Sequence, residues 1–263
     1  MLEIRDVSFS YGKSEILSGI NMSISRGEFV AVLGVNGAGK STLVKIASGY
    51  LKPQKGDVRL GGKSVFEYSP KDLSLLRAVL EQETNMEFDS SVLETVALGR
   101  FSMSGFWGMD GQSLKISKEA LKIVGLEGAE EKMYMSLSGG EKRRVQLARA
   151  IAQILHEPEG KLLLLDEPTA NLDPARSLQT MSICSKLCKM GASCMAVVHS
   201  VNLALAYAGK TLMLKDSKIF KFGDTADVIT SENVSQLYGL DCQILGDSAK
   251  TVALSLHQKA LSH

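Results

Sequence analysis

The sequence predicts an α/β fold in which a mostly parallel sheet is covered on both faces. The first observation is that short apolar runs with strand character alternate along the chain with segments of helical periodicity. This alternation is typical of parallel sheets, because parallel neighbours are usually connected through a helix. The second observation is a glycine-rich stretch, 34–41, which lies between a buried apolar run and a helical segment.

Length, composition and charge narrow the class of protein. The chain has 263 residues, of which 44% are hydrophobic and 22% charged, which is ordinary for a globular domain. Its net charge of +1 provides no overall basic field for binding nucleic acid. No apolar run approaches the ~20 residues that a membrane span needs, and the charged start, Met1–Asp6, is unlike a signal peptide. We therefore expect a protein that stays in the compartment where it is made.

The four cysteines suggest packing rather than chemistry. Cys184 and Cys188 are four residues apart, so a helix would place them on one face. No further cysteine or histidine accompanies them at the spacing of a metal site. We expect buried, reduced thiols that act as small apolar side chains.

The first part of the chain predicts three strands and a helix. Leu2–Phe9 and Ile16–Ile24 alternate apolar and polar residues, as half-buried strands do, and Phe29–Leu33 is apolar throughout. A helix is expected from 39 to 49, after the glycine-rich stretch. Short strands are then expected at 58–60 and 63–66.

A capped helix and a short strand follow. Ser69 and Pro70 form a helix start, with serine at the cap and proline at the first helical position, and this helix is expected to end near Arg77. Ala78–Leu80 predicts a short apolar strand. From about residue 84 to residue 136 β-branched runs thin out and helical periodicity appears, which predicts a mainly helical insertion.

The rest of the chain returns to alternating strands and helices. The long helix that closes the insertion is expected over 138–155. The expected later elements are a strand at 161–165, a helix at 173–191, a strand at 194–198, a helix at 201–208, a strand at 211–214, and a tail of short strands with one helix at about 226–238.

The glycine-rich stretch has the residues that a polyphosphate requires. Gly34, Gly39, Lys40 and Ser41 fit the pattern of a phosphate-binding loop. Glycines let consecutive backbone amides point at the phosphates, and the following helix adds its positive end. Lys40 supplies a full charge, and the Ser41 hydroxyl is a ligand for Mg²⁺. We therefore predict nucleotide binding.

A pair of acids forms the second half of the predicted site. Asp166 and Glu167 follow four leucines, Leu162–Leu165, at the carboxyl end of a buried strand. Ligands of parallel sheets bind at that edge. We expect Asp166 to hold Mg²⁺ through water and Glu167 to act as the general base on the attacking water.

A third motif identifies a family. Leu137–Glu141 reads Leu-Ser-Gly-Gly-Glu, starts a helix, and ends 25 positions before Asp166. With the glycine loop and the acid pair, it resembles the nucleotide-binding subunit of ATP-binding-cassette (ABC) transporters, over residues 1–240. The resemblance implies the fold of a P-loop NTPase with a mixed or parallel core sheet, an N-terminal antiparallel β subdomain and an inserted helical subdomain. It implies a single domain, 1–263, with a core of 1–83 and 156–263 and a helical signature subdomain of 84–155.

The resemblance also implies ligands, ATP and Mg²⁺, and a role for each site residue. Residues implied to bind the nucleotide in their own subunit are Tyr11, which stacks on adenine, and Gly34, Asn36, Gly37, Ala38, Gly39, Lys40, Ser41 and Thr42. Residues implied to cap the nucleotide of the opposite subunit are Ser138, Gly139 and Gly140. Implied ligands of the metal are Ser41, Gln82 and Asp166, and the implied catalytic residues are Glu167, His199, Gln82 and Asp173.

Plainer roles remain open at three of these positions. Tyr11 would otherwise cover an edge strand, Gln82 would be an ordinary loop residue, and His199 would be a surface histidine. Two residues depart from the family pattern: Val35 stands where proline is commonest, and Glu141 replaces the usual glutamine. We expect neither departure to abolish activity.

One glycine loop and one signature in a single chain imply a shared site. Each subunit would bind ATP and cap the ATP of its partner, so the chain is expected to act as a head-to-tail homodimer, or to pair with a similar subunit, at the cytoplasmic face of the membrane. The implied partners are integral-membrane permease subunits and, indirectly, a periplasmic or surface substrate-binding protein; nucleic acid is not expected. Gln82 and the segment after it are expected to form the permease groove. Phe88, Met103, Phe106 and Met109 would line that groove or belong to the core.

The finer resemblance is to importers of haemin, ferric siderophores and cobalamin. It rests on Arg77–Gln82, Glu94–Arg100, Val145–Arg149 and the insert His156–Gly160, which is most similar to the haemin group. Import of cobalamin or of a ferric siderophore remains an alternative. A soluble ABC ATPase of iron–sulfur assembly is an alternative from another class, while a simple kinase or GTPase would lack Ser138–Gly140.

Overall fold

The computed structural model describes residues 1–82, 89–103, 110–245 and 251–254. Over this part of the chain the strands form three sheets. A four-stranded antiparallel sheet has the order β2-β1-β4-β5, a six-stranded sheet has the order β10-β9-β3-β8-β7-β6, and β11 pairs with β12. The strands are β1 (Leu2–Tyr11), β2 (Ser14–Ile24), β3 (Phe29–Gly34), β4 (Lys55–Leu60), β5 (Lys63–Ser64), β6 (Arg77–Leu80), β7 (Leu162–Asp166), β8 (Ser193–Val197), β9 (Lys210–Lys215), β10 (Lys218–Asp224), β11 (Cys242–Leu245) and β12 (Thr251–Leu254).

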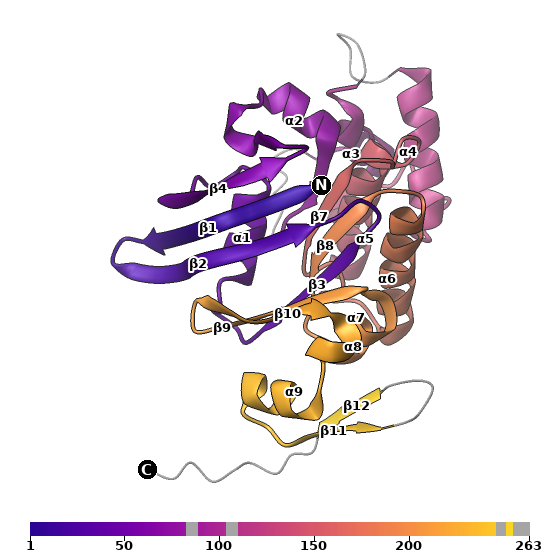
Figure 1. Ribbon diagram of the computed structural model, residues 1–263. Coiled ribbons are helices and arrows are strands. Elements are labelled where there is room, and N and C mark those ends of the chain that lie inside the picture. The colour runs from indigo at the N-terminus through magenta and orange to yellow at the C-terminus, as the bar shows by residue number, and fades with distance from the viewer. Residues whose placement is uncertain (83–88, 104–109, 246–250, 255–263) are drawn as a thin grey trace.

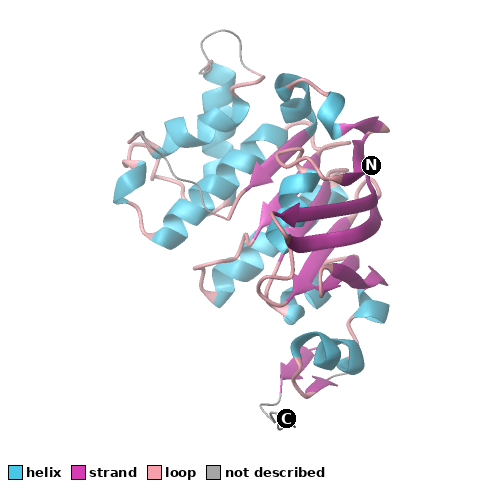
Figure 2. Cartoon of the chain, turned by 90° about the vertical axis from the view of Figure 1, so that its left-hand side faces the viewer, coloured by secondary structure: helices cyan, strands magenta, loops and turns pink. Residues whose placement is uncertain are grey.

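The helices lie between these strands and mainly on one side of the large sheet. Figure 2 shows most of them on the side away from the N-terminal strands. The α-helices are α1 (Lys40–Ala47), α2 (Pro70–Leu76), α3 (Val92–Ala97), α4 (Gly111–Ile123), α5 (Gly139–Ile154), α6 (Pro174–Lys189), α7 (Val201–Tyr207), α8 (Thr225–Val228) and α9 (Ser231–Tyr238). Short 3-10 turns are η1 (Val65–Glu67), η2 (Leu98–Arg100) and η3 (Tyr134–Ser136).

The large sheet is parallel except at one edge. Its strands β9, β3, β8, β7 and β6 run parallel, and β10 is added antiparallel to β9. The buried strand β7 shows how this sheet organises the core, because its successive side chains point to opposite faces. Leu163 and Leu165 join the apolar cluster that includes α4, α5 and α6, whereas Leu162 and Leu164 join the cluster that includes α1, β1 and β2.

The second cluster shows what covers the other face of the parallel sheet. As predicted, both faces are covered, and this one is covered by α1 together with the antiparallel sheet that the family resemblance implied (Figure 1). The apolar side chains of β1 and β2, such as Ile4 and Ile20, are fully buried there. The antiparallel sheet packs here because its apolar face needs the same cover that the parallel sheet needs.

The helical stretch after β6 packs as predicted in type. Helices α3, α4 and α5 contact one another, and α5 also contacts β6. Ser91 and Ser138 each start a helix with a capping box, in which the serine and the glutamate three residues later bond reciprocally. The boundaries 84 and 155, which divide a helical subdomain from the core, stay a prediction.

Two local predictions are wrong. The expected strand 63–66 pairs only at Lys63–Ser64, and the chain then turns through η1 because Val65 is buried under the antiparallel sheet. The expected single helix 226–238 is two helices. Thr230 starts the second of them, with its hydroxyl accepting from the amide of Asn233 at 3.1 Å.

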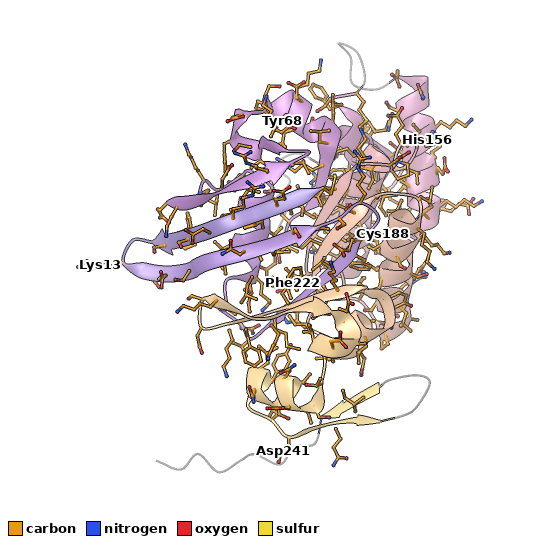
Figure 3. The ribbon with its side chains drawn as sticks, in the orientation of Figure 1. Lys13, Tyr68, His156, Cys188, Phe222 and Asp241 are labelled. Atoms are coloured by element: carbon orange, nitrogen blue, oxygen red, sulfur yellow. The ribbon has the colours of Figure 1, made fainter. Side chains whose placement is uncertain are left out.

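The cysteines have the packing role that was predicted. All four are free and buried, and Cys184 and Cys188 lie on the buried face of α6. Figure 3 labels Cys188. Among the residues that the structure describes, no group of three or more metal-binding side chains is positioned to hold an ion. Within the same residues, no helix combines the length and the apolar character that crossing a bilayer requires.

Candidate functional site

A cavity of about 450 Å³ opens at the carboxyl edge of the parallel sheet. Five segments meet there: strand β2, the loop between β3 and α1 with the start of that helix, and the residues that follow β6, β7 and β8. Its lining residues are Ile16, Asn36, Gly37, Gly39, Lys40, Ser41, Thr42, Gln82, Glu167 and His199. The topology therefore brings together most of the residues that the sequence assigned to the nucleotide.

The loop after β3 takes a path that requires glycine. Gly37 and Gly39 have φ of +81° and +94°, in the left-handed region that favours glycine. A Cβ atom on Gly39 would lie 2.7 Å from the carbonyl oxygen of Ile16. Gly39 also starts α1 without a capping side chain, so the first amides of this helix are left to a ligand.

Lys40 is held by the loop that it serves. Its Nζ donates to the carbonyl oxygens of Gly34 and Val35, each at 2.8 Å. Burial lowers the pKa of Lys40, and the negative charges of Glu167 and Asp166 oppose this effect. Because residue 35 takes part through its carbonyl oxygen, valine serves here as well as proline would.

Asp166 lies below the loop and is almost inaccessible, with 2% of its surface exposed. Burial raises the pKa of its carboxyl, and a hydrogen bond from the Ser41 hydroxyl opposes that rise. Within the described part of the chain, its Oδ1 atom is buried and has no hydrogen-bond partner. A buried carboxylate oxygen beside a serine hydroxyl is a donor set that suits Mg²⁺.

Glu167 and His199 contact each other at the wall of the cavity. The Nε2 atom of His199 lies 2.8 Å from Oε1 of Glu167. Glu167 has a φ of +52°, a conformation that costs a residue with a side chain about 1–3 kcal/mol. Strain of this kind persists only where surrounding contacts enforce it, so the position of this carboxylate is built into the fold.

The signature residues do not line the cavity of their own chain. Ser138 caps α5, and Glu141 completes the capping box by accepting from the Ser138 amide at 3.0 Å and its hydroxyl at 2.7 Å. These hydrogen bonds lower the pKa of Glu141. The departure from glutamine at position 141 therefore stabilises the start of α5.

Five further predicted residues also lie outside the cavity lining, and Gly34 and the buried Asp166 are two of them. Tyr11 is 51% exposed and packs edge-to-face on Phe9, with ring centroids 4.9 Å apart. Asp173 caps α6 by accepting from the amide of Arg176 at 2.9 Å. Ala38 is buried beneath the loop. Ile16, which the sequence did not single out, lines the cavity.

Arg143 is the residue at this edge that sequence reasoning missed. Its guanidinium is buried and donates to backbone carbonyl oxygens beside Gln82 and Glu167. The signal was present in the sequence: Arg143 lies four and seven residues before Leu147 and Ala150, so it shares the buried face of α5. Its place in the run Lys142–Arg144 hides that signal, because such a run is usually a solvated face.

The strained glycine at the helix start generates a prediction. Gly39→Ala should lower nucleotide affinity at least tenfold, because the new Cβ collides with the Ile16 carbonyl and displaces the loop. Gly128→Ala is the matched control: Gly128 also has a positive φ of +84°, but a Cβ there meets nothing within 4 Å. Calorimetric titration with a non-hydrolysable ATP analogue measures both variants. Equal affinities for the two would contradict the role of this loop.

Comparisons with known proteins agree with this geometry. The family model described as ABC transporter matches residues 17–170. A "Hemin import ATP-binding protein HmuV" of Gloeobacter violaceus is 36% identical over 248 residues, which cover 93% of this chain and 90% of that protein. The protein of the same name from Rhizobium meliloti is 34% identical, and the match covers 99% of each of the two chains.

Solved structures show the same fold. An inward-facing "putative metal-chelate type ABC transporter" matches with a TM-score of 0.80 and 28% identity, covering 97% of this chain and 98% of that one. The dimeric cassette MJ0796 matches with a TM-score of 0.76 and 28% identity, covering 86% and 99%. The chain therefore belongs to the ABC transporter family, as one of its ATPase cassettes.

Proposed function

We propose that this cassette hydrolyses ATP to power the import of haemin through a membrane permease. The observation that supports the ATPase part is the cavity in which the glycine loop, Glu167 and His199 meet. The observation that supports haemin is the name shared by relatives that are 34–36% identical over almost the whole chain.

The cavity residues suit a bound triphosphate. The loop amides and the start of α1 would surround the β- and γ-phosphates, and Asn36, Gly37 and Thr42 line that part of the cavity. The buried Lys40 would place its charge on the same oxygens, where low dielectric strengthens the attraction. Tyr11 would stack on adenine.

Glu167 and His199 have the geometry for the hydrolytic step. Glu167 would take a proton from water as that water attacks the γ-phosphorus, and ADP is the leaving group. His199, 2.8 Å from this carboxylate, would orient it and contact the γ-phosphate. Gln82 lines the same cavity.

A magnesium ion fits the donor set. The Ser41 hydroxyl, the unpartnered Oδ1 of Asp166 and the Gln82 amide oxygen would hold it, Asp166 through water. When bound, Mg²⁺ neutralises charge that develops on the phosphate oxygens. Its charge would add to the positive charges of Arg143 and Lys45 that already act on the buried carboxylate of Asp166.

A second copy of the chain would complete the site. Ser138, Gly139 and Gly140 lie outside the cavity of their own chain, so their proposed contact with a γ-phosphate needs a partner subunit. The solved cassette MJ0796 is titled as a dimer. ATP would shift the population toward a closed head-to-tail homodimer because it binds that state more tightly. Asp173 lies near the proposed interface.

The proposed partners follow from the family. Integral-membrane permease subunits would dock on the helical subdomain 84–155, at the cytoplasmic face, and an external binding protein would deliver the substrate to them. Of the residues named for the permease groove, Met103 is half-buried, while Phe88, Phe106 and Met109 lie outside the described residues. Import of cobalamin or a ferric siderophore is the nearest alternative, supported by a structural match titled as a metal-chelate transporter.

Neutralising the proposed base should separate binding from turnover. Glu167→Gln keeps the shape of the side chain but cannot accept the proton, so we expect ATP binding without hydrolysis and a dimer trapped by Mg-ATP. Phosphate release and size-exclusion chromatography measure the two effects. Hydrolysis at the parental rate would show that Glu167 is not the base.

Mixed subunits test the shared site. Lys40→Ala disables nucleotide binding and Ser138→Arg blocks the cap, so each variant alone should be inactive. Mixing them should restore one intact site per heterodimer. That site combines the intact phosphate loop of the Ser138→Arg subunit with the intact α5 of the Lys40→Ala subunit. The measurement is ATPase activity against mixing ratio, and a flat zero at every ratio would contradict the head-to-tail arrangement.

Transport in vesicles tests the substrate. The cassette would be co-reconstituted with its membrane partner and supplied with haemin, cobalamin or a ferric siderophore. We expect ATP-dependent uptake of haemin, abolished by Glu167→Gln. Uptake of cobalamin or siderophore in place of haemin would favour that alternative. A cassette that associates with a soluble scaffold and with no permease would favour a role in iron–sulfur assembly.

A further inference from the structure

We propose that Arg143 is a positioning residue that ties the signature helix α5 to Glu167 and Gln82. Seating a partner's nucleotide on the start of α5 would thereby set the catalytic carboxylate of the same chain. The inference rests on the proposed shared-site ATPase. It concerns a buried guanidinium that links the two halves of the fold and is not itself in the cavity.

Among the described residues, the hydrogen bonds of Arg143 go to backbone carbonyl oxygens. Its Nε and Nη2 atoms donate to the carbonyl of Glu167 at 3.2 and 2.9 Å, and Nη2 also donates to the carbonyl of Asp166. Its Nη1 atom donates to the carbonyls of Glu81 at 2.5 Å and Gln82 at 3.2 Å. One planar group therefore reaches two chain segments that are more than eighty residues apart in sequence.

These carbonyls lie just beyond the last paired residues of β6 and β7. Strands β6 and β7 are paired from Arg77 with Leu162 to Leu80 with Leu165, and no later pair joins them. Beyond that point the guanidinium takes the place of the strand pairing. A guanidinium offers five N–H donors in a fixed plane, while a lysine offers one compact charge on a flexible stem. Arginine therefore fits this position in a way that lysine does not.

The bonds to Glu167 bear on its strained conformation. Two N–H groups on its carbonyl oxygen fix the peptide that follows the residue with φ of +52°. That conformation aims the carboxylate at His199. Without the guanidinium the peptide could rotate, and the carboxylate would move away from the attacking water. The phosphate loop would stay intact.

The same helix carries the proposed cap. Ser138 starts α5, and Arg143 lies five residues later, about 7.5 Å along the helix axis. A helix of 16 residues moves as a rigid rod over that distance. A nucleotide on Ser138 would thus reach Glu167 and Gln82 through one side chain.

A matched pair of substitutions tests this role. Arg143→Lys and Arg144→Lys both keep the charge and remove the planar fork. Arg144 lies next along the same helix but donates to the carbonyls of Val124 and Gly125, away from the cavity. In the full-length dimer we expect Arg143→Lys to lower kcat at least tenfold with KM for ATP within twofold, and Arg144→Lys to leave both within twofold.

A second readout separates positioning from general damage. Arg143→Ala should lose kcat as well, and millimolar guanidinium ion should restore part of it in a saturable way, with no effect on Arg144→Ala. Equal kcat for the two lysine variants would overturn the proposal, as would a rise in KM alone or a loss of kcat that guanidinium leaves unchanged. The dimer trapped by Glu167→Gln with Arg143 intact reports separately on the proposed function.

Discussion

The site depends on the parallel pairing of β3, β8, β7 and β6. Parallel strands have their carboxyl ends at one edge, so the residues that leave those ends meet there. The loop with Lys40, the acids Asp166 and Glu167, and the residues Gln82 and His199 come from four separate parts of the chain. No local feature would place them together, and an antiparallel neighbour among these strands would send one of them to the far edge.

Burial of charge gives this edge its chemical character. Lys40 and Asp166 are both nearly inaccessible, and burial disfavours the charged form of each: the pKa of Lys40 is lowered and that of Asp166 is raised. Their opposite charges partly offset this cost. A triphosphate and a divalent cation would complete the balance, since each supplies the charge that one of these buried groups lacks.

Helix α5 joins the two ends of the proposed reaction. Its start is stabilised locally, because Glu141 and Ser138 form hydrogen bonds with each other. The two residues between them are glycines, which have no side chains. Its buried face carries Arg143, which holds carbonyls at the ends of β6 and β7. One end of the helix therefore lies at the surface that a second subunit would contact. Its buried face is bonded to the backbone of Glu167, whose carboxylate would act on the nucleotide of its own subunit.

The sequence by itself determined the elements whose signals are local. The glycines of the loop, the leucines of β7 followed by two acids, and the serine caps of α2 and α5 each act on neighbours within a few residues, so their pattern can be recognised without the fold. The boundaries of most strands and helices, and the family itself, followed from such signals.

Only the tertiary structure decided which distant groups meet. The burial of Val65 ended a strand early, and Ile16 came to line the cavity. Arg143 reads as part of a basic run until the fold buries it against carbonyls 23 to 62 residues away. These outcomes depend on packing and on hydrogen bonds between remote segments, and the pattern of one helix or strand does not specify which remote segment it will meet.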